Sequence, residues 1–202
     1  MPTNNFGIQV NQDNILEFQK IIEDLGRYRI EVGIFAEDDS FYAMIANVHE
    51  YGMTIKAKKK FLTIPLPPSE GRSASEIEGL FRPPNTQILA TSENGVLTPM
   101  FVLKEQVKIP ERSFIRASFD EKEGDWTGLM ERLLDKVFAF EITVEQMFEQ
   151  VGARVVADIQ AKIRSISSPA NSSLTKKNKG SSNPLIDDGG LIQRITWKVV
   201  SS

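Results

Sequence analysis

The turn and strand around which this chain is organised are predicted by the stretch Asn183-Pro184-Leu185-Ile186-Asp187-Asp188-Gly189-Gly190-Leu191-Ile192-Gln193-Arg194-Ile195-Thr196-Trp197-Lys198-Val199-Val200. Proline opens the turn, and two aspartates followed by two glycines let the backbone reverse tightly. The residues that follow are rich in β-branched and aromatic types. Leu191, Ile195, Trp197 and Val199 share one parity and form its apolar face. We therefore expect a buried strand that ties down this end of the chain.

Length and composition set the broad class. The chain has 202 residues, of which 41% are hydrophobic, so it can bury a substantial core. Charged residues make up 25%, an ordinary value for a globular protein. The net charge of -3 and the pI near 5.4 argue against a general nucleic-acid coat, which usually carries a basic excess. Local basic patches stay compatible with this composition.

The residue types that are absent exclude several kinds of chemistry. There is no cysteine, which rules out disulfides, thiolate metal sites and cysteine nucleophiles. No apolar run approaches the roughly 18 residues that span a bilayer, and the N-terminus lacks the basic and apolar regions of a signal peptide. The sequence predicts a protein made in the cytoplasm that contacts no membrane.

The first quarter of the chain predicts a helix, a strand and a second helix. Residues 13–25 place apolar side chains on one stripe, with Asp13 or Asn14 available as N-cap and glycine after the last turn. Residues 27–35 alternate between apolar and polar types, as a half-buried strand does. Residues 40–51 return to a helical period, with Ser40 as the expected cap.

The segment of about residues 53–108 is predicted to be an insertion. Its first part, to about residue 86, is rich in lysine, proline and serine, and we expect a projecting, mobile arm. Its second part contains Asn94-Gly95 between two apolar runs, the strongest short signal for a β-hairpin.

Two helices are predicted in the second half. One runs from about 121 to 140, after a helix start near Phe114. The next opens with the capping-box sequence Thr143-Val-Glu-Gln146 and runs to about 166, roughly 35 Å at 1.5 Å per residue. Residues 167–183 contain one large apolar residue, so we expect a second flexible arm there.

Three ordered motifs resemble the tail-completion, or head-tail joining, proteins of long-tailed bacteriophages. The first is a helix end, His49-Glu50-Tyr51-Gly52, and the second is Ile109-Pro110-x-Arg112-x-Phe114-x-Arg116. The third is Pro184-Leu185-x-Asp187-x-Gly189, leading into a Leu-x-x-x-Ile strand. Family members with a long insertion also carry a strand similar to Phe101–Lys104.

This chain departs from the family pattern at four motif positions. Glu111 stands where alanine is usual and Ser113 where proline is usual. Asp188 replaces a threonine and Arg194 replaces a serine. The hydrophobic and basic positions of the second motif are kept, and the three motifs span about residues 28–200 together with the insertion.

Candidate chemical sites in the sequence have simpler structural explanations. His49-Glu50 resembles half of a zinc-protease helix, but the position four residues on is Met53 and the chain has no other histidine. The acidic runs Glu37-Asp38-Asp39 and Asp187-Asp188 lack calcium-loop spacing, and aspartates commonly close turns. No glycine-rich phosphate loop or nucleophile elbow is present. We predict no catalytic residue, metal or cofactor.

From the residues alone, the sequence predicts one α+β domain spanning 1–202. An antiparallel sheet is expected to pack against the long C-terminal helix and shorter helices, with arms at about 53–86 and 167–183. For the ring that the family resemblance implies, the expected interface residues come from the arms and the second motif; they are Lys58, Lys59, Lys60, Phe61, Arg112, Arg116, Leu174, Lys176, Lys177 and Leu185. The two arginines can pair with acidic groups within the subunit or across an assembly, and the sequence does not choose between these.

The resemblance implies a non-enzymatic virion protein of the tail or neck, assembled in the host cytoplasm. It implies a ring, expected to be a homohexamer, that joins tail to filled capsid by contacts with a head-tail connector or adaptor and a tail terminator or tube. DNA would pass through the channel and touch the protein transiently. An alternative of another class is a nucleic-acid-binding accessory protein that uses the lysine-rich loops, although these lack interleaved aromatic residues. A hydrolase has no residues to support it.

Overall fold

The chain is a mixed α+β protein, as the sequence predicts. The computed structural model describes residues 12–179 and 182–201, with side chains from Ile15 onward. Its helices are α1 (Gln12–Arg27), α2 (Ala36–Tyr51), α3 (Ile115–Phe138), α4 (Val144–Ser165), α5 (Ser173–Lys179) and α6 (Gly190–Gln193). Its strands are β1 (Tyr28–Gly33), β2 (Met53–Lys56), β3 (Leu62–Pro65), β4 (Ile88–Glu93), β5 (Val96–Lys104), β6 (Gln106–Ile109) and β7 (Thr196–Ser201).

Two compact units can be distinguished, each built from separate stretches of the chain. Unit 1 comprises residues up to Gly33, Ala117–Gln160 and residues from Ile195. Unit 2 comprises Ile34–Arg116 and Ala161–Arg194. The prediction of one domain implies that the two units unfold together.

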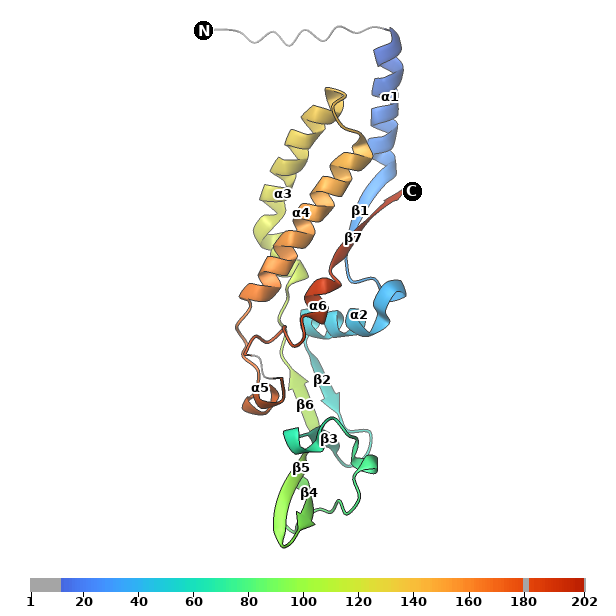
Figure 1. Cartoon of the computed structure of the whole chain (residues 1–202). Coiled ribbons are helices and arrows are strands. Elements are labelled where there is room, and N and C mark those ends of the chain that lie inside the picture. The colour runs from blue at the N-terminus through green and yellow to red at the C-terminus, as the bar shows by residue number, and fades with distance from the viewer. Residues whose placement is uncertain (1–11, 180–181, 202) are drawn as a thin grey trace. The chain divides into compact units, whose positions relative to one another are not determined.

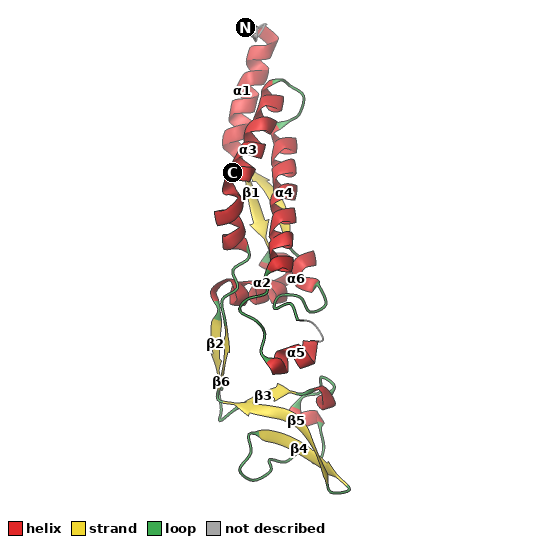
Figure 2. Cartoon of the chain, turned by 90° about the vertical axis from the view of Figure 1, so that its left-hand side faces the viewer, coloured by secondary structure: helices red, strands yellow, loops and turns green. Residues whose placement is uncertain are grey.

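Unit 1 is a helical layer with a small antiparallel sheet. β1 pairs with β7, so that Val32 lies opposite Trp197. In Figures 1 and 2 these strands run beside α4, and the rings of Tyr28 and Phe148 lie 6.4 Å apart. The predicted packing of a sheet on the long C-terminal helix is therefore present. The helix before it is slightly longer, however, with 24 residues in α3 and 22 in α4.

The core of unit 1 lies mainly on α3 and α4. The capping box forms as predicted: Gln146 N donates to Thr143 Oγ1 at 3.1 Å, and Thr143 N donates to Gln146 Oε1 at 3.0 Å. Its buried apolar side chains recur at helical spacing; on these helices they include Trp126, Leu133, Val137, Val144, Met147, Phe148, Val151, Val155, Val156 and Ile159. The helix predicted to open at Thr143 is present, and the residues of this set from Val144 onward form its buried face.

Unit 2 contains the other sheets. β2 pairs with β6, and β3, β5 and β4 form a three-stranded sheet in that order. The Asn94-Gly95 hairpin between β4 and β5 is confirmed, with both residues at positive φ. The sequence missed β2 and β3, because each has only four residues and lies among prolines and lysines. The segment predicted to be a mobile arm therefore contributes a strand to each sheet.

The C-terminal turn differs from the prediction. Residues 190–193 form α6, so the strand begins at Thr196 and not at Leu191. Gly189 has φ of 85°, a conformation that favours glycine, and a Cβ on Gly190 would overlap the Tyr42 hydroxyl. The two glycines thus have separate roles, one in the backbone turn and one in the close approach of α2. Leu191 and Ile195 are buried, but both precede β7, whose residues are half-buried from Thr196 to Val200, so the prediction of a buried strand is wrong for β7 itself.

Helix α2 has a break that the sequence did not predict. It begins at Ala36, four residues before the predicted start, and Asp39 inside it has non-helical φ and ψ. The Asp39 carboxylate accepts a hydrogen bond from Tyr42 N at 3.1 Å, so Asp39, and not Ser40, caps the part of the helix that follows. This hydrogen bond is the main reason why the pKa of Asp39 is lowered, and Arg194, which binds the same carboxylate, lowers it further.

Candidate assembly surface

Large apolar side chains are exposed in both units. In unit 1, the exposed apolar side chains of α1 include Ile15, Leu16 and Ile22. Phe18 of the same helix stacks on Phe138, with their ring centres 5.9 Å apart. The amphipathic stripe predicted for α1 is therefore only partly covered. In unit 2, the exposed apolar side chains are Phe41, Met44, Tyr51, Met53, Ile55, Phe81, Val96 and Leu97. Clustered exposed apolar residues commonly mark contact sites for other chains.

The β2–β6 ribbon is the most exposed sheet that the structure describes. All four residues of β2 are exposed, and Met53 and Ile55 keep 42% and 40% of their surface accessible. Within residues 12–179 and 182–201, β2 has no strand partner except β6. A two-stranded ribbon is marginally stable in water unless another element covers it. Its outer edge can accept a strand from a second chain.

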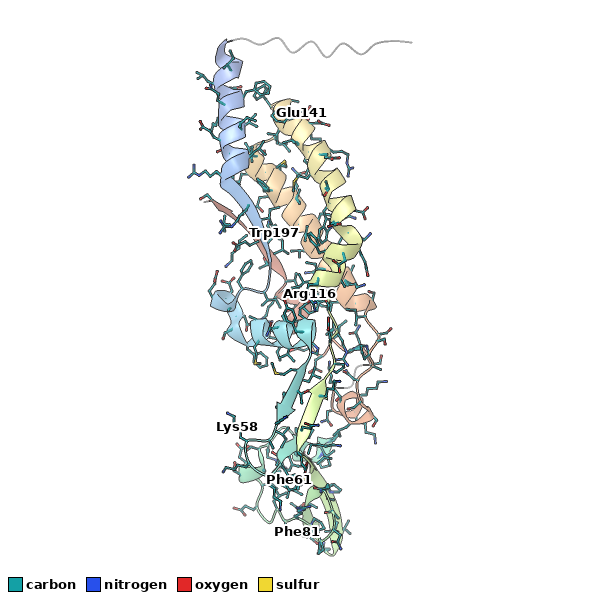
Figure 3. All side chains as sticks on the ribbon, turned by 180° about the vertical axis from the view of Figure 1, so that it is seen from behind. Lys58, Phe61, Phe81, Arg116, Glu141 and Trp197 are labelled. Atoms are coloured by element: carbon teal, nitrogen blue, oxygen red, sulfur yellow. The ribbon has the colours of Figure 1, made fainter. Side chains whose placement is uncertain are left out.

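The predicted interface residues Lys58–Phe61 follow strand β2 in the sequence. Lys58, Lys59 and Lys60 are exposed, and Figure 3 shows Lys58 and Phe61. Phe61 is half-buried, and the charged groups of Lys60 and Arg82 lie 5.7 Å and 5.1 Å from its ring centre. This geometry is a cation–π arrangement within the subunit.

The second predicted arm is more ordered than the sequence suggests. It contains α5, and Asn178 Nδ2 donates to the carbonyl of Pro65 at 2.7 Å. Lys176 and Lys177 are exposed, Leu174 is half-buried and Leu185 is 4% exposed. Leu185 is therefore a core residue of its own subunit. Two residues of this predicted arm, Gly180 and Ser181, lie outside the described part of the chain.

The second motif meets the first at Glu50, which is 5% exposed. One carboxylate oxygen accepts hydrogen bonds from Phe114 N at 2.6 Å and Ile115 N at 2.5 Å. The other accepts from Ser113 Oγ at 2.8 Å and Arg116 Nε at 3.2 Å. These donors lie at the start of α3, where backbone N–H groups have no partner within the helix. Glu50 lies on α2, far from α3 in the sequence, and caps the start of α3. Its negative charge complements the positive end of the α3 dipole.

Arg116 makes further contacts to Glu50 and to its neighbours, Tyr51 and Glu111 among them. Its Nη2 bonds the Glu50 carbonyl and, at 2.8 Å, the Glu111 carboxylate, while its guanidinium lies 4.5 Å from the Tyr51 ring centre. Hydrogen bonding to Glu111, and then to Glu50, raises the pKa of Arg116. Arg116 (Figure 3) is therefore paired with acidic groups within the subunit, the alternative that the sequence left open.

Gly52 explains why the first motif ends in glycine. It has φ of 68°, and a Cβ there would lie 2.9 Å from Glu111 N. The backbones of the first two motifs approach too closely for any larger residue without a shift. Arg112 N also donates to the His49 carbonyl at 2.7 Å. The third motif reaches the same helix, because the Tyr42 hydroxyl lies 3.4 Å from a carboxylate oxygen of Asp188.

Arg112 occupies a different environment from Arg116. It is 5% exposed, and it donates from Nε to the Pro169 carbonyl at 2.6 Å and from Nη2 to Asn171 Oδ1 at 3.2 Å. Both acceptors are neutral, so no carboxylate of the described residues pairs with this arginine. Burial lowers the pKa of Arg112 from its ordinary value. Arg112 therefore holds the backbone at Pro169 and the side chain of Asn171, and it keeps a buried positive charge.

A groove of about 820 Å³ opens beside Arg112 in unit 2. Its positively charged lining residues are Lys104, Lys108, Arg112 and Lys179. Two buried polar atoms, His49 Nδ1 and Asn171 Nδ2, belong to residues that line it and have no hydrogen-bond partner. Sequence reasoning missed Lys104, Lys108 and Asn171, since nothing local indicates that β5, β6 and the 170–175 loop meet.

His49, which resembles half of a zinc-protease helix in the sequence, lines this groove. His49 is half-buried, and burial, followed by the charges of Arg112 and Lys179, lowers its pKa to about 4. In the part of the chain that the structure describes, no three His, Asp or Glu side chains are placed to hold a metal ion. No helix in the described ranges combines the length and apolar character that crossing a membrane requires.

Comparison with known proteins gives no assignment. No protein-family model matches this chain, and neither curated proteins nor solved structures give a significant match.

Proposed function

We propose that this chain is a structural virion protein of a tailed bacteriophage, acting in tail completion or head-tail joining. The observation that carries the proposal is the meeting of the three resembling motifs at α2. Glu50 caps the helix that begins in the second motif, and Gly52 lies against its backbone. Asp188 of the third motif contacts Tyr42. Residues that support the resemblance are thus the ones that build unit 2, which favours a shared fold over chance similarity.

The proposed mode of action is assembly into a ring, expected to be a homohexamer, through which DNA passes. Repeated head-to-tail contacts close a ring when the rotation per subunit divides the circle. The exposed β2–β6 ribbon and the apolar side chains of α1 supply surface for such contacts. The remaining faces would contact connector, adaptor, tail terminator or tube proteins in the neck of the virion. Lys58, Lys59 and Lys60 are available for partner contacts, whereas Leu185 belongs to the core.

Light scattering on the purified protein, followed by negative-stain imaging, tests this proposal. We expect a mass that is a multiple of the 22.7 kDa chain, and closed rings in the images. Ile55→Asp places a charge on the exposed apolar side of β2 and should shift the protein towards monomer. Thr54→Asp is the matched control on the same strand. A monomer at all concentrations that also fails to bind phage heads or tails would refute the proposal.

A nucleic-acid-binding role is the second candidate, because Lys58, Lys59, Lys60, Lys176 and Lys177 are all exposed. Fluorescence anisotropy with labelled duplex DNA separates the two. A DNA-binding function predicts an affinity that falls steeply with salt, since each neutralised phosphate adds to the slope. Weak binding with a shallow slope favours transient contact in a channel.

A further inference from the structure

The groove beside Arg112 combines an apolar floor with a positively charged rim. Ile64 on β3 and Val102 on β5 lie opposite each other in the sheet register, and both line the groove. Lys104, two residues from Val102, continues the same face of β5. The segment that contains Asn171 forms another part of the wall.

The charge of this groove is not balanced by its own lining. No aspartate or glutamate is among the described residues that line it. Arg112 donates to two neutral oxygens, and a buried guanidinium without a carboxylate is normally costly. An anion arriving from outside would offset that cost.

Lys179 is the fourth positively charged residue that lines the groove. It is half-buried, and its Nζ donates to the Pro184 carbonyl at 3.3 Å. Burial is the main cause that lowers the pKa of Lys179; Arg112 lowers it further, and Asp187 and Asp188 act in the opposite direction. The effect of Asp187 is larger than that of Arg112, so burial and not repulsion accounts for the lowered pKa of Lys179, and these two aspartates are not among the residues that line the groove.

Two unused polar atoms point to a ligand with hydrogen-bonding groups. His49 Nδ1 and Asn171 Nδ2 are buried without a partner, and few such atoms occur in native structures. The Asn171 amide nitrogen is a donor, while its Oδ1 is already occupied by Arg112. A ligand with carboxylate or carbonyl oxygens would match this donor.

We propose that the groove binds an extended acidic peptide segment of a partner protein, with apolar side chains between its carboxylates. Carboxylates would meet the four cationic side chains, and the apolar residues would cover Ile64 and Val102. A peptide matches this lining better than nucleic acid does, because no phenylalanine, tyrosine or tryptophan among the described lining residues can stack on a base. The proposal does not depend on ring formation.

Fluorescence anisotropy with a labelled acetyl-Glu-Leu-Glu-Leu-Glu-Leu amide tests the proposal on the full chain. We expect saturable binding that weakens as salt is raised, and no binding of the same peptide with glutamine in place of glutamate. Lys104→Glu combined with Lys108→Glu should lower the affinity at least about tenfold, since both changes reverse charge at the groove. Arg132→Glu combined with Lys136→Glu, both exposed on α3, makes the same change in net charge outside the groove and should alter affinity less than about twofold.

The outcomes separate this site from the proposed assembly role. Binding lost only in the groove variant supports the site, whether the protein is a ring or a monomer. Equal losses in both double variants would show non-specific charge attraction and overturn it. Absence of binding at millimolar peptide would also overturn it. So would a single-stranded DNA oligonucleotide that binds more tightly than the peptide and loses affinity in the groove variant.

Discussion

The cores of the two units differ in the kinds of residues that they bury. In unit 1, the core lies mainly on two consecutive helices and is almost entirely apolar, with Ser118 as its buried polar residue among those described. In unit 2, the sheets have only two and three strands. Glu50, Ser69 and Arg112 are buried there together with the apolar residues. Glu50 and Arg112 join segments that are more than 50 residues apart. Unit 1 therefore depends on packing, whereas unit 2 depends also on a few specific polar contacts.

This difference predicts unequal sensitivity to the loss of one charged side chain. Glu50→Ala should lower the free energy of unfolding by about 3 kcal/mol or more, because it leaves Arg116 without its buried partner and α3 without its cap. Urea unfolding followed by far-UV circular dichroism measures the effect. It is the largest that we expect from any single change.

Glu111→Gln is the matched control for this experiment. Glu111 pairs with the same arginine, but its side chain is 55% exposed, so its loss should change stability little. Similar destabilisation by both variants would contradict the proposed role of Glu50.

Glu50→Ala also tests whether the two units unfold together. The chain has two tryptophans, Trp126 and Trp197, and both belong to unit 1. Tryptophan fluorescence therefore reports unit 1, while circular dichroism reports both units. If the chain unfolds as one domain, Glu50→Ala shifts both transitions equally. If the units unfold separately, the midpoint should shift more by circular dichroism than by fluorescence, because Glu50 is buried in unit 2 and reaches unit 1 only through the start of α3.

A second prediction targets the packing of unit 1. Gly152 on α4 lies under Trp197, and a Cβ there would overlap the indole Cδ1. Gly152→Ala should destabilise the protein by about 1–3 kcal/mol, because a rigid ring must move, even though alanine favours the helix. The Trp197 Nε1 hydrogen bond to Glu149, at 2.6 Å, would be disturbed as well. The fluorescence midpoint in urea measures the loss.

Gly124→Ala is the control, since this glycine lies on α3 and a Cβ added there would meet nothing within 4 Å. Here the helix propensity of alanine should act alone and stabilise the protein by up to about 1 kcal/mol. Stabilisation by both substitutions would mean that Trp197 does not restrict Gly152.

The sequence predicted unit 1 better than unit 2 for a physical reason. The apolar spacing of α4 and its capping box are local patterns, and both are present in the structure. Short strands such as β2 and β3 take their partners from residues more than 35 positions away, and no local pattern specifies that pairing. The strand predicted from Leu191 begins later, because Gly190 allows one helical turn against Tyr42.

Site residues divide in the same way. Arg112 and Arg116 were singled out by a motif, but only the structure distinguishes a buried anchor from a partly exposed ion pair. Lys58–Lys60 are exposed, as their charge predicts. Leu185 is buried although it follows a polar loop, and the composition of that loop does not predict its burial. The groove combines four separate segments, so no local sequence pattern indicates it.

The smallest predicted effect concerns His49, the only histidine in the chain. Its pKa is about 4 in the folded protein, against an ordinary value of 6.5, mainly because of burial. As pH falls from 6.5 towards 4, the unfolded chain takes up a proton that the folded chain does not, so stability is lost over this window. Between pH 7.5 and pH 5 we expect a loss of about 1 kcal/mol, after discounting for solvent screening of the partly exposed ring.

His49→Gln removes this titration and leaves the carboxylates unchanged, so the difference between the two pH profiles isolates the histidine. From pH 7.5 to pH 5 the urea midpoint by circular dichroism should fall further for wild type than for the variant, because only wild type loses the histidine contribution. Parallel profiles would mean that the imidazole is as accessible to protons in unit 2 as in the unfolded chain. Because Arg112 and Lys179 contribute to the lowered pKa, such a result would also weaken the case for an unbalanced positive groove.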